Sequence, residues 1–346
     1  MRRIIAILCL CLMIAVPVDA LEFTAPKVPA SGREYMPDET ENFGQGLMFI
    51  LQSAVERIHP NVTEAISFCG LLISASLIFG MVSDLSDNTE KVTQLTGIAI
   101  VAVILLQPTK ILIHLGVDTV QQISQYGKML LPVLTSAMAA QGSVSKSGAL
   151  YSATVFFDAL LSSAISKLLV PLVYTFIFIS IASRILNHSI LQDMRRFLKW
   201  LLTWGLKIIL YVFTGYISIT GVVGGTTDAA MLKATKLTIS GVVPVVGNIL
   251  SDASEAVLVS ASMMKNAVGI YGLLAVMAIW VGPFIQTGVQ YLLLKITAGI
   301  CGMFAGKQMS ALMKDFSDAM GLVLAMTGTM CLIILISIIC FMRSVP

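Results

Sequence analysis

The stretch GLVLAMTGTMCLIILISIICFM, residues 321–342, contains no charged side chain. An apolar helix of this length can cross the hydrocarbon core of a bilayer, which is about 30 Å thick and needs about 20 residues. Five more apolar stretches of comparable length occur, at 66–83, 95–116, 168–185, 200–222 and 270–294. The sequence therefore predicts an all-α polytopic integral membrane protein with about six transmembrane helices.

The composition agrees with a membrane protein. Hydrophobic residues make up 57% of the 346 positions, charged residues only 12%, and the mean hydropathy is +0.89. Soluble domains carry about 25% charged residues, so this chain could not cover a water-facing surface. The basic residues behind the net charge of +3 are scattered, which argues against nucleic-acid binding. No CxxC spacing occurs, so neither a zinc site nor a disulfide framework is indicated.

Residues 1–20 have the pattern of a signal peptide. Arg2 and Arg3 precede an apolar run from Ile4 to Val16, and Val18-Asp19-Ala20 supplies a small-residue cleavage site. The mature chain would then begin outside the cytoplasm. The alternative is an uncleaved membrane anchor.

Residues 21–65 are predicted to form an extracytoplasmic acidic segment that carries an amphipathic helix. Up to Gln45 the segment is rich in Pro, Glu and Gly, which is typical of a flexible chain. Apolar residues then recur at helical spacing and predict a helix on the outer membrane surface that ends at His59-Pro60. The apolar residues are Leu47, Ile50, Leu51, Ala54, Val55 and Ile58.

Residues 66–346 are predicted to form the multi-span membrane domain. Lys and Arg are denser in connections 84–94, 184–199 and 295–318 than in the other connections. Cytoplasmic loops carry such an excess, which favours an extracytoplasmic N-terminus. The segment 150–183 leaves two alternatives open, because Lys167 and Pro171 interrupt it and it could cross the membrane once or twice.

An internal repeat is also indicated. At an offset of 112 residues LLPV, 130–133, falls on VVPV, 242–245, and Pro171 falls on Pro283. The two copies would cover 95–196 and 200–310 in the same orientation, as in parallel-repeat transport folds.

The stretch VVPVVGNILSDASEA, 242–256, is too short and too acidic to span a membrane. We expect a helix that starts near Ser251 and lies in the outer interface. The spacing of Asp252 and Glu255 fits either a helix cap or a charged docking site, and both remain open. The candidate interfacial or partner motif comprises Pro244, Gly247, Asn248, Asp252, Glu255 and Asn266.

At these residues the chain resembles a known family, the stage III sporulation protein AE of endospore-forming bacteria. The resemblance is sharpest in GGTTDAAMLKATKLTISGVVPVVGNILSDASEAVLVSASMMKNAVGIYG, 224–272, and extends over essentially the whole chain. It implies a multi-pass subunit of a mother-cell-to-forespore channel, or secretion-like complex, in the mother-cell membrane around the forespore. It implies as partners the other stage III sporulation A-operon proteins, including a secretion-type ATPase and ring-forming subunits, and stage II sporulation protein Q across the intermembrane space. It supplies no catalytic residues.

Asp158 is the candidate polar lining residue, with Ser162 and Ser166 on the same helical face. A carboxyl group in lipid is costly unless it faces the bundle or a water-filled cavity. The alternative is that this segment lies at the interface and Asp158 is in water.

Small residues recur at every fourth position near the end of the chain and predict close helix packing. This stripe, expected along one helix, comprises Ala298, Gly302, Gly306 and Ser310.

No HExxH or P-loop motif occurs, and the three histidines are far apart. We therefore expect no enzyme, no cofactor and no metal site. Three classes of function remain: a channel-complex subunit is favoured, a self-sufficient secondary transporter is the alternative, and a membrane enzyme ranks third.

Overall fold

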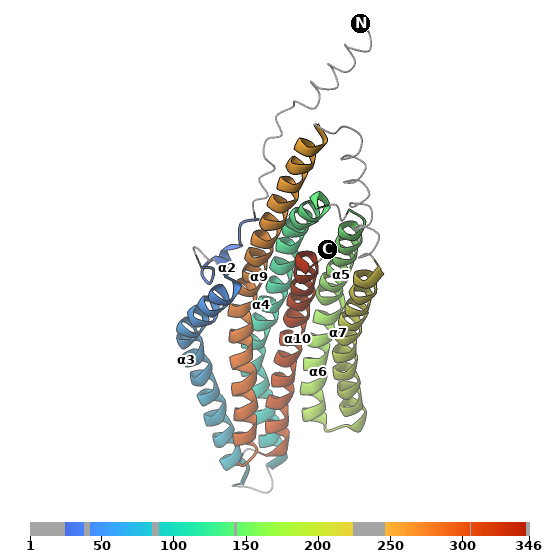
Figure 1. The fold of residues 1–346 in the computed structure, drawn as a ribbon. Coiled ribbons are helices and arrows are strands. Elements are labelled where there is room, and N and C mark those ends of the chain that lie inside the picture. Colours follow the sequence, from blue (N-terminus) through green and yellow to red (C-terminus); the bar gives the residue numbers. More distant parts are fainter. Residues whose placement is uncertain are drawn as a thin grey trace.

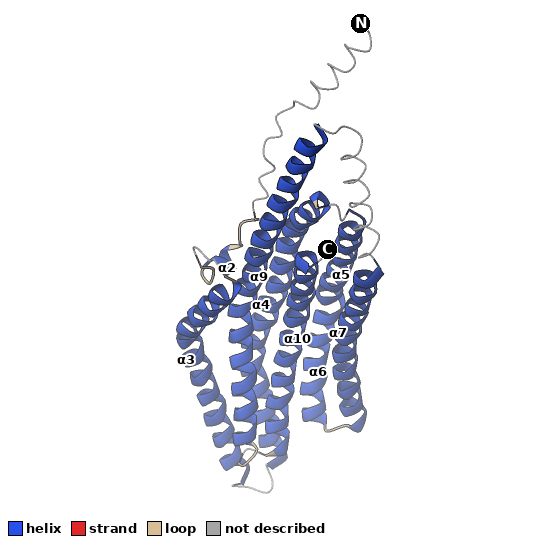
Figure 2. Ribbon diagram, in the orientation of Figure 1, coloured by secondary structure: helices blue, strands red, loops and turns tan. Residues whose placement is uncertain are grey.

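The computed structural model describes residues 25–37, 42–84, 90–141, 144–223, 246–304 and 306–343. Every element in this part of the chain is a helix (Figure 2). The predicted signal peptide, Pro244 and the segment 224–237 lie outside the described residues.

The helices form one elongated bundle (Figure 1). Six described segments are long and apolar enough to cross a membrane, which confirms the predicted fold class. In chain order the helices are α2 (Ala30–Arg33), α3 (Phe43–Asp84), α4 (Glu90–Ala140), α5 (Val144–Ala164), the π-helix η1 (Ile165–Leu169), α6 (Val170–Leu186), α7 (Ser189–Val223), α9 (Val246–Cys301) and α10 (Lys307–Arg343).

The long helices alternate in direction. The α3–α4, α6–α7 and α9–α10 connections lie at one end of the bundle, the end that the charge pattern predicts to be cytoplasmic (Figure 1). At the opposite end the first turns of α9 rise above the other described helices.

Helix α10 is the centre of the bundle and packs against α4, α5, α6, α7 and α9. Its side chains Phe316, Met320 and Ile334 are fully buried. Gly116 lets α4 approach closely, since a Cβ atom there would lie 2.4 Å from Val323 Cγ1. The apolar stretch 321–342 is therefore part of the core helix, surrounded by protein.

The segment α5–η1–α6 settles the question left open at 150–183. The three helices follow one another without a turn, so this part of the chain runs through the bundle once. The π-helical turn ends just before Pro171, which lies at the start of α6. Single π-helical turns occur inside longer α-helices, and here the turn directly precedes Pro171, which lacks the N–H group that an α-helix would use.

The amphipathic helix expected to end at Pro60 does not end there. Pro60 lies inside α3, which continues to Asp84 and bends along its length (Figure 1). The expected apolar face is also placed differently: Ile50 and Ala54 are buried against Leu274 and Ala278 of α9. Helix α9 offers this face a more apolar surface than the membrane–water interface does, so Ile50 and Ala54 pack on protein.

The acidic segment that begins at residue 21 is not flexible throughout. Residues 25–37 are ordered against α9, with Val28 and Gly32 buried. A Cβ atom on Gly32 would lie 2.8 Å from Ile279 Cγ1, so only glycine permits this contact. The close approach of the Gly32 backbone to α9 holds residues 25–37 in place, and amino-acid composition does not reveal such a contact.

The outer interfacial helix expected near Ser251 is also corrected. Helix α9 begins at Val246 and runs unbroken to Cys301, so residues 251–266 belong to one long helix that continues into the candidate membrane span Lys265–Cys301. Apolar residues continue at helical spacing through this region, and extending an existing helix is more favourable than ending it and nucleating a new one. The internal repeat stays a prediction.

Helix α7 marks one membrane boundary. Phe197, Trp200 and Trp204 form an exposed row of aromatic rings, with neighbouring ring centroids 6.0 Å apart. Aromatic side chains gather at membrane–water interfaces. The row lies beside Arg195, Arg196 and Lys199, as expected for a cytoplasmic boundary.

Candidate functional site

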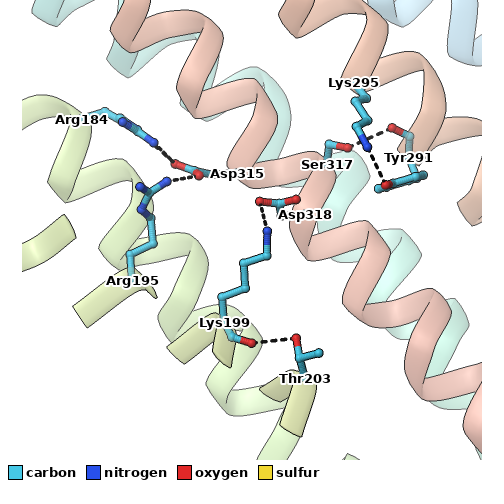
Figure 3. Close-up of polar contacts among 9 residues, drawn as sticks. All are labelled: Arg184, Arg195, Lys199, Thr203, Tyr291, Lys295, Asp315, Ser317 and Asp318. Carbon is cyan, nitrogen blue, oxygen red and sulfur yellow. Dashed lines mark hydrogen bonds and ion pairs between the residues drawn. The ribbon is translucent and has the colours of Figure 1, made fainter. Parts of the chain in front are cut away.

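The end of the bundle near the α6–α7 connection contains a buried ion cluster (Figure 3). Asp315 of α10 is only 3% exposed and accepts hydrogen bonds from two arginines. Arg184 of α6 donates to Oδ2 through Nη2 at 2.8 Å and through Nε at 3.1 Å, and Arg195 of α7 donates to Oδ1. One carboxylate thus joins three helices, which we call the Asp315 clamp.

A second ion pair lies beside the clamp, on its more exposed side. Lys199 Nζ lies 2.6 Å from Asp318 Oδ2. On the α9 side Ser317 donates to the Tyr291 carbonyl at 3.0 Å, and Lys295 donates to the Tyr291 hydroxyl at 3.0 Å. Figure 3 shows these groups converging from α7, α9 and α10.

A cleft of about 350 Å³ opens next to these groups, between α7 and α9 with α10 as its floor. Lys199, Lys207, Tyr291 and Asp318 supply its polar lining, and Leu206 and Leu322 supply apolar walls. The arrangement can bind a polar or anionic group at the membrane boundary.

Asp158, the predicted polar lining residue, is 1% exposed and lies between α5 and α4. Ser124 donates to its Oδ2 at 2.8 Å, while Oδ1 has no hydrogen-bond partner among the described residues. The alternative that placed Asp158 in interfacial water is therefore wrong. Ser162 and Ser166 are partly exposed, and η1 begins between them and changes the helical register.

Another buried polar contact lies near Asp158. Thr154 of α5 donates to Ser337 of α10 at 2.8 Å, and both residues are buried. Together with Ser124 and Asp158 this forms a polar layer through α4, α5 and α10 at membrane depth. Buried polar contacts of this kind fix how helices pack in lipid.

The small-residue stripe occupies two helices instead of one. Ala298 lies in α9, Gly302 and Gly306 lie in the turn, and Ser310 lies in α10. Gly306 has φ +83°, a backbone conformation that favours glycine. The residues still meet, because Ser310 donates to the Ala298 carbonyl at 2.6 Å across the hairpin.

The candidate interfacial motif is only partly described. Pro244 lies outside the described residues, and Asn266 is exposed on α9. For Gly247, Asn248, Asp252 and Glu255 the structure describes the backbone alone, which is helical. Because α9 starts at Val246, Asp252 is not at the helix start, and the cap interpretation is wrong.

The Asp315 clamp was missed by the sequence analysis. The signal was present as Asp315 and Asp318 at the start of the last span, near the height at which Arg184 and Arg195 flank another connection. The orientation prediction counted only Lys and Arg residues, so it did not consider the aspartates that pair with them. Among the described residues no group of three His, Cys, Asp or Glu side chains could hold a metal ion.

Comparison with known proteins identifies the family of the chain. The family model for stage III sporulation protein AE matches residues 37–344. The chain belongs to this family. A curated relative, stage III sporulation protein AE of Bacillus subtilis (strain 168), is 22% identical over 207 residues, which cover 60% of this chain. The match spans 52%, about half, of that relative's length. No solved structure matches the chain.

Proposed function

We propose that the chain is a membrane subunit of the mother-cell-to-forespore channel, a secretion-like complex required for endospore formation. The observation that carries the proposal is membership of the stage III sporulation protein AE family over nearly the whole chain. The multi-span helical architecture supports it, since such a subunit must be held in the membrane.

The proposed location is the mother-cell membrane that surrounds the forespore. In this arrangement the Asp315 clamp faces the mother-cell cytoplasm, and the outer parts of α4 and α9 face the intermembrane space. The proposed partners are the secretion-type ATPase and ring-forming proteins of the same operon, and stage II sporulation protein Q on the forespore side.

The test is copurification from sporulating cells of the bacterium that encodes the chain. An affinity-tagged chain is expected to bring down the operon partners after engulfment, and deletion of its gene is expected to block spore formation. A control variant is Asp193→Asn, which removes an exposed ion pair with Arg196, leaves Asp315 and its two arginines in place and should behave like the parent. Normal spores in the deletion strain would contradict the proposal.

The alternative function, a self-sufficient secondary transporter, is favoured by one observation. Asp158 is a membrane-buried carboxyl group two turns before the π-helical turn η1. Such carboxyl groups mark ion and proton pathways in transporters, and π-helical turns often lie at functional sites. Purified protein in liposomes separates the two functions. Gradient-driven solute uptake without any partner would favour the transporter over the subunit.

A further inference from the structure

The outward face of α4 carries a row of polar side chains at helical spacing. At 100° per residue these side chains fall within about 80° of arc. All of them are exposed, and we call them the α4 polar row: Gln107, Lys110, His114, Asp118, Gln121, Gln125 and Lys128. The same face below the row is apolar, with Val92, Ile100 and Val103 exposed.

The contacts of α4 with α10 give the depth of the upper part of the row. Gly116 lies against Val323 and Thr327, and Gly127 lies against Ile334. Between Asp318 and Arg343 helix α10 carries no charged residue, and this part forms the most apolar membrane span. Asp118, Gln121 and Gln125 are therefore level with the middle of the α10 span.

The contacts of α4 with α3 give the depth of the lower part. Gly97 lies against Phe79, and the two helices run in opposite directions. Lys110 therefore lies level with about Ile66, inside the apolar segment Val62–Val82. Whichever neighbour is used to place the bilayer, part of the row lies at hydrocarbon depth.

Lipid is an unsuitable neighbour for these side chains. Charged and amide groups exposed to hydrocarbon are costly, and those in membrane helices face a bundle interior or water. Lysine can extend toward the interface, whereas the short side chain of Asp118 cannot. Within the part of the chain that the structure describes, Gln107, Lys110, His114, Asp118, Gln121 and Gln125 have no hydrogen bond or ion pair.

The surface along the row is hollowed. An open hollow of about 790 Å³ follows α4. Gln107, Lys110, His114 and Asp118 line it together with four apolar side chains of the same helix, Val103, Leu106, Ile111 and Leu115. The described part of the chain leaves this hollow open on its outer side.

We propose that the α4 polar row is the water-facing wall of a passage enclosed by several copies of this chain. Copies in one membrane share one orientation, so a closed ring brings the same residue to the same height. Glutamine amides both donate and accept hydrogen bonds, so identical glutamines complement each other. Equal charges at one height, as at Lys110 or Asp118, require water between them.

The chemistry of the wall indicates what would pass. The two lysines of the row exceed its single aspartate, so each copy contributes a small positive excess. Rings of basic side chains favour anions in narrow pores. The passage would suit small anionic or polar solutes. This inference rests on the proposed role as a channel subunit and names the face of the chain that would line the channel.

Single-cysteine variants test the passage in the full-length protein, reconstituted in phosphatidylethanolamine–phosphatidylglycerol vesicles. His114→Cys and Gln121→Cys probe the row. Ile66→Cys and Ile208→Cys are exposed controls on α3 and α7. Ile66 is level with Lys110, and Ile208, nine residues beyond the Lys199–Asp318 pair, is level with about Thr327. The parent protein gives the background of the native cysteines.

A membrane-impermeant methanethiosulfonate is expected to label the row at least about tenfold faster than the controls, because the reactive thiolate forms in water and not in lipid. A bis-maleimide is expected to join Gln121→Cys of one copy to the same residue of another. Equal labelling at all four sites would mean that this height is simply in water, and equally slow labelling would mean that the row faces lipid. Either result overturns the passage.

Fast labelling of the row without a cross-linked dimer would overturn enclosure by copies of this chain. The assay uses purified protein and no sporulating cells, so its outcome is independent of the copurification. If operon partners copurify but the row stays unlabelled, the passage fails while the subunit role stands. If the row labels and cross-links but no partner copurifies, the proposed role fails instead.

Discussion

Asp315 is the residue on which the end of the bundle near the α6–α7 connection depends most. A buried carboxylate that pairs with two arginines is costly to desolvate, yet removal of one partner leaves uncompensated buried charge. Arg184 and Arg195 are 12% and 19% exposed, so water replaces the lost partner only in part.

We expect Asp315→Asn to destabilise the protein by about 3–5 kcal/mol, because two largely buried arginines lose their counter-ion. The control is Asp318→Asn, whose partner Lys199 is half-exposed, with an expected cost below about 1 kcal/mol. Thermal unfolding in detergent, followed by tryptophan fluorescence, compares them. Equal melting temperatures for the two variants would show that the clamp adds no stability.

Gly116 is a second decisive residue, because α4 and α10 touch through it. Gly116→Ala places a methyl group 2.4 Å from the β-branched Val323, which cannot swing away freely. The expected cost is about 1–3 kcal/mol from overpacking. Gly148→Ala on α5 is the matched control, because nothing lies within 4 Å of its Cβ position. In the same unfolding assay that change should stabilise the protein by about 0.5–1 kcal/mol.

At the scale of the elements, the α9–α10 turn depends on Gly306. Its φ of +83° costs other residues roughly 1–2 kcal/mol, so Gly306→Ala should lower stability by about that amount. Gly288→Ala, inside α9 with open space around it, serves as the control and should not destabilise. Urea titration of tryptophan fluorescence checks the pair, and an unchanged midpoint for Gly306→Ala would contradict the strained-turn account.

The helical spans could be predicted from sequence because each contains enough apolar residues to cross a membrane on its own. The ends of the helices could not. Pro60 and Ser251 both looked like boundaries, but a proline or a cap signal is weak against the packing of Ile50 on α9 and the continuity of that helix. Whether a helix forms is set by its own residues, whereas where it ends depends on the helices packed against it.

The polar residues divide in a similar way. Asp158 could be singled out because a carboxyl group in an apolar segment is unusual in any fold. Its partner Ser124 lies on another helix, and no sequence pattern joins the two. The small-residue stripe was recognised as a packing feature, but its regular spacing concealed the turn that Gly306 makes.

At the scale of the whole molecule, the arrangement of the connections predicts the orientation. We expect a cysteine in place of His188, between α6 and α7, to react with a membrane-impermeant maleimide only after the cell membrane is opened. A cysteine in place of Val144, exposed at the start of α5, should react in intact protoplasts. The expectation follows from the basic residues that flank the α6–α7 connection. The reverse pattern would invert the bundle and move the Asp315 clamp outside.

Helix α9 has a mechanical consequence. Gly269 lies against Met342, near the end of α10, so the turns from Val246 to Gly269 extend roughly 35 Å farther at 1.5 Å per residue. A rigid rod of this length carries whatever its tip presents well clear of the lipid headgroups. Since this backbone is already helical, attachment at the tip loses little chain entropy, and a pull on the tip is transmitted along α9 to Tyr291, which lines the cleft beside the Asp315 clamp.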